Sequence, residues 1–305
     1  MRPGKARPLL LLFVNLFTQD NSLPPDQEAV LHHLAEALAS SQLARPQVVV
    51  RVGPRDLPVI GERLAGLKGF TVELLGAESL ERRLPMVRDI LQGSALAGTI
   101  ASQETSSPLP PYALYINADI CLPPYFFDLV AQQVAQAAWG QASGDRPGWI
   151  PPESLIVNRR DRSRPASETA GPSTLMWHPG YDCFAFPLAL LPQMELGEAC
   201  VGLPPIGALL ALNLLVLSRR LLLIDELCLS WHEGSDRQWA SEAHQKATAA
   251  NWEAAAAAFR QLTRHDPRVL AHLPFVGFEK NLAAFSYRPL ATQFAKSFCA
   301  PMPQG

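Results

Sequence analysis

The segment from Tyr112 to Ile120, YALYINADI, constrains the fold of this chain more than any other. It begins as an unbroken apolar run, which is typical of a strand that is buried on both faces of a sheet. The run ends at Asn117 and Asp119, and the Pro123-Pro124 pair stops the strand and opens a helix. Ligands of open α/β sheets bind at the carboxyl ends of strands, where a carboxylate can hold a cation and the cation a phosphate.

Strand-like and helix-like segments alternate along most of the chain. Strands are predicted at 9–17, 47–52, 70–75, 112–117, 154–158, 183–186 and 221–224, and helices at 25–40, 84–91, 125–138, 206–217 and 242–264. This alternation predicts an α/β fold with a mostly parallel sheet and helices on both faces. Two stretches rich in Gly, Pro, Ser and Arg, 140–149 and 160–172, are predicted to be loops.

The composition excludes several classes of protein. The 305 residues include 26 Lys+Arg against 28 Asp+Glu, a balance that does not point to nucleic acid or to an anionic membrane. Five scattered cysteines without CxxC spacing argue against a disulfide framework and favour a reducing, cytoplasmic location.

The basic N-terminus imitates a signal peptide, but its apolar run is short and is interrupted by Asn15, so we interpret it as the first buried strand. No segment reaches the roughly 18 uninterrupted apolar residues that a transmembrane helix needs.

Polar clusters next to strand-like sequence are the candidates for chemistry. Asp119 either binds a cation, with Asn117 orienting ribose or phosphate, or caps the helix that follows the proline pair. Asp182 follows Pro179-Gly180, which is predicted to form a turn. Its carboxylate either accepts a proton from an acceptor hydroxyl or bonds its own backbone.

Two further clusters contain His232 and the pair Arg159 and Arg160. The imidazole of His232 is either a metal ligand or phosphate contact, or a satisfied core residue. The paired guanidinium groups match the oxygens of a diphosphate, and the alternative is a solvated loop with a local Arg–Asp pair. The chain has no GxGxxG, P-loop or GxSxG motif, which argues against dinucleotide-binding, P-loop and serine hydrolase proteins.

The clusters follow one another in a particular order: a strand ending in Asn-Ala-Asp, then Asn-Arg-Arg-Asp, then His-Pro-Gly-Tyr-Asp-Cys-Phe-Ala-Phe, then His-Glu-Gly-Ser-Asp-Arg-Gln-Trp. This order resembles the glycosyltransferase-like proteins of the GT-A (nucleotide-diphospho-sugar transferase) superfamily. The resemblance implies a GT-A-like nucleotide-sugar-binding domain at 1–240, with a mixed, mostly parallel sheet. Residues 241–305 would be a helical extension packed on it.

The resemblance also implies roles for individual residues. Asp119 matches the last acid of the family's metal-binding motif, with Asn117 in place of the first. His232 is the implied second ligand of a divalent cation, Mn²⁺ or Mg²⁺. Asp182 is the implied catalytic residue, in the acceptor-side region where the family has a base or a substrate-binding acid. Contacts with the nucleotide sugar are expected from Asn15, Arg88, Asn117, Asp119, Arg159 and Arg160.

The leading hypothesis is therefore a glycosyltransferase that moves a sugar from a nucleotide-diphosphate donor to an unknown hydroxyl acceptor. The alternative is a non-catalytic GT-A-like module that binds a nucleotide, a glycan or a partner, because one acid of the motif is missing. A nucleotidyltransferase is the weakest hypothesis, since the loop at 18–22 is neither Gly-rich nor basic.

Overall fold

The computed structural model describes residues 7–76, 84–103, 109–143, 153–162, 175–218, 220–224, 228–233 and 242–265. Its strands are β1 (Leu9–Asn15), β2 (Arg45–Val52), β3 (Phe70–Leu74), β4 (Tyr112–Ile116), β5 (Ile120–Cys121), β6 (Ser154–Arg162), β7 (Leu175–Pro187), β8 (Leu221–Ile224) and β9 (Trp231–His232). Its helices are α1 (Pro25–Ser40), α2 (Leu57–Leu64), α4 (Val87–Leu91), α5 (Ala95–Gln103), α6 (Phe126–Ser143), η2 (Leu188–Gln193), α7 (Ile206–Leu217) and α8 (Glu242–His265).

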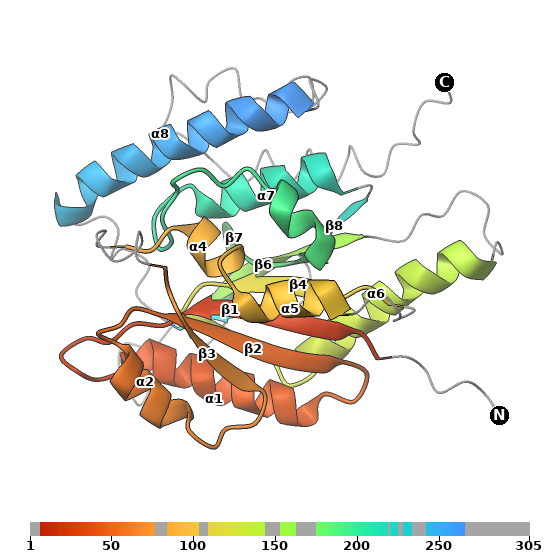
Figure 1. The fold of residues 1–305 in the computed structure, drawn as a ribbon, viewed down its shortest axis with the longest axis horizontal. Helices are drawn as coiled ribbons and strands as arrows, with labels where there is room; N and C mark the ends of the chain where they lie inside the picture. The colour runs from red at the N-terminus through yellow and green to blue at the C-terminus, as the bar shows by residue number, and fades with distance from the viewer. Residues whose placement is uncertain are drawn as a thin grey trace.

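The described strands form one nine-stranded sheet in the order β3-β2-β1-β4-β7-β6-β9-β5, with β8 paired to β6. Strands β1 to β4 are parallel neighbours, and β6 is parallel to β8 and β9. Strand β7 runs antiparallel between β4 and β6. The predicted fold class is confirmed: a mixed, mostly parallel sheet flanked by helices (Figure 1). One edge of this sheet therefore collects the carboxyl ends of β1, β4 and β6 and the first half of β7.

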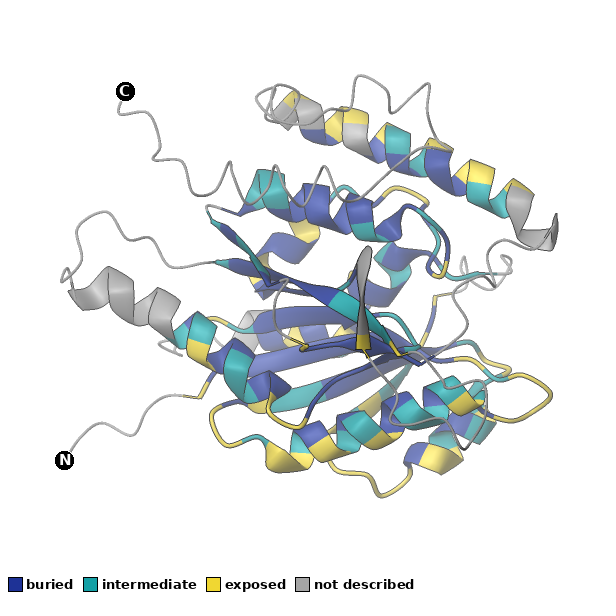
Figure 2. Ribbon diagram, turned by 180° about the vertical axis from the view of Figure 1, so that it is seen from behind, coloured by how far each residue is buried: buried dark blue, intermediate teal, exposed yellow. Residues whose placement is uncertain are grey.

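The first strand shows why the chain folds into layers. Leu9, Leu11 and Phe13 belong to one buried apolar cluster, whereas Leu10, Leu12 and Val14 belong to a second one on the opposite face. Because side chains alternate along a strand, this leucine-rich run contributes to both cores at once. Figure 2 shows the sheet as a mostly buried layer between helices whose outer faces are exposed.

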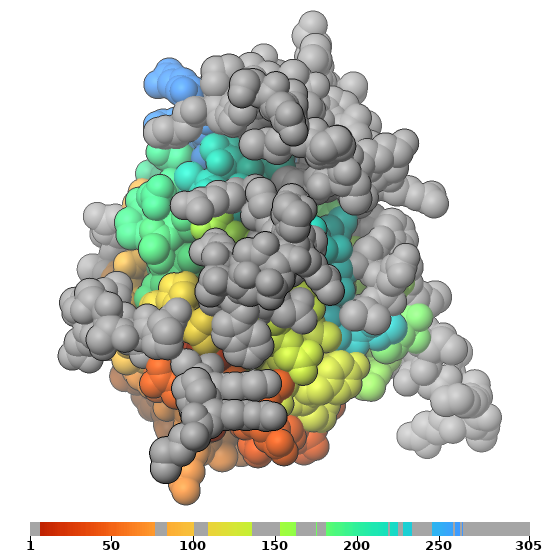
Figure 3. Space-filling model, turned by 90° about the vertical axis from the view of Figure 1, so that its right-hand side faces the viewer, coloured from red at the N-terminus to blue at the C-terminus, as the bar shows by residue number. Residues whose placement is uncertain are grey.

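Helices α1, α2 and α6 pack on one face of the sheet, and α4, α5, η2 and α7 cover the other (Figure 1). Helix α8 lies outside α7 and contributes Trp252, Ala255 and Leu262 to the same apolar cluster as α7. The space-filling view of Figure 3 shows red and orange N-terminal residues below and part of the blue α8 above on one side of the molecule. No helix among the described residues is long and apolar enough to cross a membrane.

Helix α7 approaches β7 closely at Gly207. A Cβ atom at this position would lie 2.4 Å from the backbone oxygen of Tyr181. No side chain can be accommodated at that distance, so the glycine allows α7 to lie directly on β7. The contacted residue, Tyr181, immediately precedes Asp182.

Several predicted boundaries were wrong. The helix predicted at 84–91 begins only at Val87, because Met86 forms a β-bridge with Cys200 and is extended. Helix α6 continues to Ser143, into the predicted loop at 140–149. Strand β6 continues to Arg162, since its last residues pair with β7 and β9. Residues 144–149 and 163–172 of the predicted loops lie outside the described residues.

The predicted turn at Pro179-Gly180 was also wrong, since both residues lie within β7. The register between β6 and β7 shifts next to Asn158, which pairs with Tyr181, while Arg160 pairs with Trp177. An irregularity of this kind absorbs extra residues without ending the strand. Helix α5 and the two-residue strands β5 and β9 were not predicted.

Candidate functional site

A tight turn after β4 carries the first predicted site residues. The Ile120 N–H donates to the Asn117 carbonyl oxygen at 3.2 Å, which closes the turn. The chain then enters β5, where Ile120 lies opposite His232 of β9. The Glu233 N–H donates to the Asp119 carbonyl oxygen at 3.0 Å. These backbone contacts place Asp119 beside His232, although the two residues are far apart in the sequence.

The side chains of Asp119 and His232 are in contact. His232 Nε2 lies 3.0 Å from Asp119 Oδ2, and the side chains of His232 and Asp119 are 5% and 35% exposed. The second carboxylate oxygen, Asp119 Oδ1, is buried and has no hydrogen-bond partner among the residues that the structure describes. This separation is that of a hydrogen bond between imidazole and carboxylate, and it is also compatible with a shared divalent cation, since two adjacent octahedral ligands at about 2.0–2.1 Å are about 2.9 Å apart.

A second polar group joins β4 to β7. Ile116 lies opposite Cys183 in the antiparallel ladder, so Asn117, which follows Ile116, is a neighbour of Asp182, which precedes Cys183. Asn117 Nδ2 donates to Asp182 Oδ1 at 2.7 Å. The Tyr115 hydroxyl donates to Asn117 Oδ1 at 2.9 Å. Asp182 is thus held by an amide on the neighbouring strand, and the alternative of an Asx turn is not what the structure shows.

Strand β6 adds a positive charge to this group. Arg159 Nη1 donates to Asp182 Oδ2 at 3.0 Å, and Arg159 Nε lies 3.3 Å from Asp161 Oδ1. The guanidinium, 11% exposed, therefore lies between two carboxylates. The local Arg–Asp pair considered from the sequence is present, on a strand rather than in a solvated loop.

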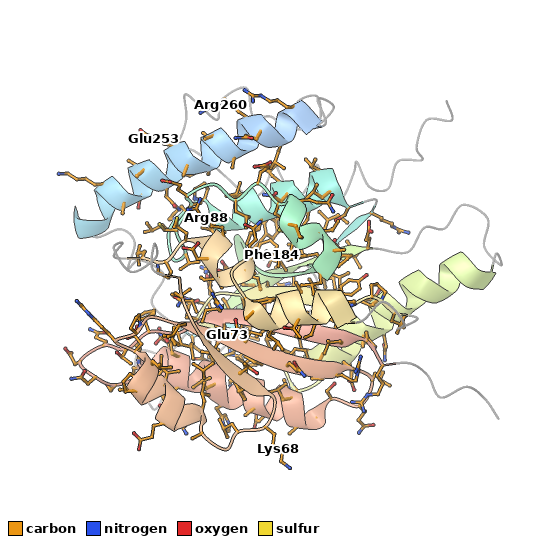
Figure 4. The ribbon with its side chains drawn as sticks, in the orientation of Figure 1. Lys68, Glu73, Arg88, Phe184, Glu253 and Arg260 are labelled. Atoms are coloured by element: carbon orange, nitrogen blue, oxygen red, sulfur yellow. The ribbon has the colours of Figure 1, made fainter. Side chains whose placement is uncertain are left out.

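The surroundings of Asp182 favour its protonated form. Burial raises the pKa of the Asp182 carboxyl above its ordinary value; Arg159 opposes the rise and the Asp119 carboxylate adds to it. Tyr115 and Phe184, whose ring centroids are 6.4 Å apart, belong to the same buried apolar cluster. Figure 4 labels Phe184 in the interior, below α7. A carboxylate that is only 14% exposed and has a raised pKa has the proton affinity that suits a general base.

The other predicted residues make different contacts. Asn15 Nδ2 donates to the Arg51 carbonyl oxygen at 2.8 Å and so joins the ends of β1 and β2. Arg88, labelled on α4 in Figure 4, has its Nε 3.6 Å from Asp89 Oδ1. The backbone N–H of Arg160 donates to the Ser230 carbonyl oxygen at 3.0 Å, and the Arg160 side chain is half-buried.

Sequence reasoning missed two residues at this edge of the sheet. Tyr115 precedes Asn117 by two positions, so the alternation of a strand could have placed both on one face. Arg51 is 2% exposed, pairs with Glu73 and donates to the Asp89 carbonyl oxygen at 3.0 Å. A lone arginine in the run VVVRV was the available signal of a buried ion pair.

A further cluster lies next to the site. Among the described residues, His33, Cys121 and Glu233 offer potential ligand atoms within 4.8 Å of one another. Glu233 Oε1 already accepts hydrogen bonds from Arg162 and from Trp231 Nε1. Burial and the nearby Glu233 carboxylate raise the pKa of the Cys121 thiol, which keeps it protonated. The cluster is thus a compensated ion pair beside a neutral thiol.

No family model and no curated protein matches the chain. Among solved structures, it is similar to S. aureus TarS 1–349 in complex with UDP-GlcNAc, with 11% identity, a TM-score of 0.44 and coverage of 95% of this chain and 81% of that one. The complex of TarS 1–349 with UDP gives 12% identity, a TM-score of 0.45 and coverage of 90% and 75%.

The chain is also similar to 4-diphosphocytidyl-2C-methyl-D-erythritol synthase from Anaerococcus prevotii DSM 20548, with 9% identity, a TM-score of 0.38 and coverage of 81% and 99%. With TM-scores of 0.38–0.45, the likeness assigns this chain no reaction and no residue of the site.

Proposed function

We propose that this protein is a glycosyltransferase that moves a sugar from a nucleotide-diphosphate donor to a hydroxyl acceptor. The observation that carries the proposal is the contact of Asp119 with His232 at the carboxyl edge of the sheet. Asp119 lies on the same turn as Asn117, which donates to Asp182. Cation-binding groups and a proton acceptor at one place are what sugar transfer from a diphosphate requires.

The departing diphosphate gains negative charge in the transition state. Asp119 and His232 would hold a divalent cation, Mn²⁺ or Mg²⁺, whose charge stabilises that leaving group. Asp119 Oδ1 supports this role: it has no hydrogen-bond partner in the described part of the chain, and a buried carboxylate oxygen without a donor is costly unless a cation binds it. Arg160 and Arg88 are the proposed phosphate contacts.

Asp182 would bind the acceptor hydroxyl and accept its proton. Its carboxylate is fixed from two sides, by Asn117 and Arg159, which gives a defined orientation to a group that must meet the hydroxyl within hydrogen-bond distance. The Arg159 guanidinium, bound by Asp182 and Asp161, contributes positive charge at the same place.

The test is hydrolysis or transfer from a panel of UDP- and GDP-sugars, with Mn²⁺ and with EDTA. Asp119→Ala should lower turnover by at least about 100-fold, the scale on which loss of an electrostatic contact to the transition state acts. Glu28→Gln is the control, because Glu28 belongs to an exposed ion pair with Arg63 and to none of the contacts of the candidate site. Equal turnover in wild type and Asp119→Ala would refute the role of Asp119.

A non-catalytic module is the second candidate, because Asn117 stands where the family has an acid. Calorimetry with UDP, GDP and Mn²⁺ separates the two functions. Binding without turnover of any donor would favour the module, and absence of binding would count against both.

A further inference from the structure

The amide of Asn117 has a fixed orientation. Its two hydrogen-bonding ends face Tyr115 and Asp182, at 2.9 and 2.7 Å. The NH₂ end faces Asp182 Oδ1, which accepts its hydrogen bond, just as Asp182 Oδ2 accepts one from Arg159. The oxygen then accepts from Tyr115, a residue 2% exposed whose pKa is raised by burial and by the Asp182 and Asp119 carboxylates, so that it remains a hydroxyl donor.

We propose that Asn117 is a positioning residue whose amide donates to Asp182 and holds its carboxylate in place, and that the site therefore needs an amide and not an acid at position 117. The role of Asp182 in the reaction rests on the proposed function. The hydrogen bonds that hold the Asp182 carboxylate do not depend on that function.

Charge explains why an acid would fail at this position. An aspartate at 117 would put a second carboxylate at hydrogen-bond distance from Asp182, and two carboxylates that share a site cannot both stay ionised. The Arg159 guanidinium already lies between the Asp182 and Asp161 carboxylates. Burial and the Asp119 carboxylate raise the pKa of Asp182, while Arg159 and His232 oppose the rise; the Asp182 side chain is only 14% exposed. The two acids would therefore share a proton, and Asp182 would lose part of its capacity to accept another.

The first experiment is a double-mutant cycle that needs no substrate. Urea unfolding is measured at pH 5, 7 and 8 for the wild type, Asn117→Asp, Asp182→Asn and the double variant. In the folded Asn117→Asp variant, the introduced carboxyl and that of Asp182 share a proton that the unfolded chain releases. The stability of this variant should therefore fall more steeply with rising pH than that of the wild type.

The double variant should recover most of this loss at pH 8. The amide introduced at position 182 can donate to the carboxylate introduced at position 117, while the oxygen of that amide accepts from Arg159. Additive effects of the two substitutions at pH 8 would overturn the proposal, because they would show that positions 117 and 182 are not coupled.

The second experiment follows Mn²⁺-dependent hydrolysis of UDP-GlcNAc as the probe reaction. Asn117→Asp should lower kcat at pH 7 by about tenfold or more and move the acidic limb of the pH profile upward, with little change in KM. The double variant should recover stability but not turnover, since it lacks the base. A higher kcat or tighter Mn²⁺ binding in Asn117→Asp would overturn the proposal.

Tyr115→Phe tests the orientation of the amide. Loss of its hydroxyl should lower kcat several-fold and shift the same pH limb. Tyr112→Phe is the matched control, because Tyr112 lies on the same strand but belongs to the apolar cluster on the opposite face. Equal effects of the two variants would contradict the role of Tyr115. If the wild type turns over no donor, the proposed function fails, and the stability cycle still decides the inference.

Discussion

Arg159 shows how much of this site depends on one side chain. Its guanidinium lies within 3.0 Å of Asp182 Oδ2 and 3.3 Å of Asp161 Oδ1, on strand β6. The sequence indicated an Arg–Asp pair here, because the residue types and their spacing are local. It did not indicate the contact with Asp182, since that contact depends on the register shift between β6 and β7, a property of two strands together.

Arg159→Met should destabilise the protein by about 1–3 kcal/mol at pH 7, because breaking this partly buried pair leaves a carboxylate uncompensated. The pKa of Asp182 is raised even with Arg159 present, and the substitution should raise it further. The stability that Arg159→Met loses relative to the wild type should therefore be largest above the raised pKa of Asp182, where its carboxylate is ionised. This loss should shrink as the pH falls toward about 4 and the carboxylate becomes protonated.

Urea unfolding in mild acid and at neutral pH measures this difference. Arg63→Met, which removes an arginine from an exposed ion pair, is the control and should change stability by less than about 1 kcal/mol. A loss for Arg159→Met that is the same at both pH values would contradict the explanation.

At the scale of elements, a carboxylate on α6 fixes the chain as it leaves α1. Asp128 Oδ1 accepts hydrogen bonds from the Ser41 hydroxyl and from the N–H groups of Gln42 and Leu43, at 2.8–2.9 Å. Burial alone would raise its pKa, but the bonds from Leu43, Gln42 and Ser41 hold the pKa of Asp128 below its usual value. The helices themselves followed from their apolar periodicity, whereas this clamp joins residues too far apart in sequence to be predicted.

Asp128→Asn should lower stability by about 1 kcal/mol at pH 7, since an amide oxygen is a weaker acceptor than a carboxylate. Because its pKa is depressed, Asp128 stabilises the fold above the unfolded value near 3.8, and this contribution is lost as the pH falls through the folded value. Thermal unfolding from neutral pH to strong acid should show the wild-type and variant curves converging in acid. Parallel curves would refute the clamp.

A buried ion pair joins β2 and β3 to the helices above them. Glu73 pairs with Arg51 and also accepts the Leu96 N–H at 2.9 Å, at the start of α5. Glu73→Gln should cost about 3 kcal/mol, because the Arg51 guanidinium would remain buried without its counter-charge.

Glu28→Gln removes the same charge from an exposed pair and should cost less than about 1 kcal/mol. Similar unfolding midpoints in urea for Glu73→Gln and Glu28→Gln would contradict this account.

At the scale of the whole molecule, α8 shares a core with the sheet. Trp252, Ala258 and Leu262 belong to the apolar cluster that also contains Leu11 and Phe184. Asn251 is 3% exposed; it accepts the Cys200 N–H at 2.5 Å and donates to the Leu203 and Pro204 carbonyl oxygens. The division at residue 240 stays a prediction.

Asn251→Ala should lower the free energy of unfolding by about 2–3 kcal/mol, since it leaves several buried backbone groups at 200–204 without partners. If α8 unfolds with the sheet, far-UV circular dichroism and tryptophan fluorescence should give one coincident transition in both proteins. A separate early transition in fluorescence alone would show that α8 unfolds independently.

The sequence predicted the alternation of strands and helices because periodicity is local. It did not predict the reversal of β7 or the pairing of β9 with β5, because two-residue strands such as Trp231–His232 carry no period. The site was predicted as residue types at one edge of the sheet. Its hydrogen bonds were not, since they depend on which strand ends become neighbours.

The glycine contact between α7 and β7 has an evolutionary consequence. Gly207 touches the backbone of Tyr181, and Tyr181 is bonded directly to Asp182. Any larger residue must displace either the helix or the strand that carries the acid. Among descendants of this sequence that keep the site, position 207 should therefore accept as few replacements as the acid itself, although the glycine has no chemistry of its own.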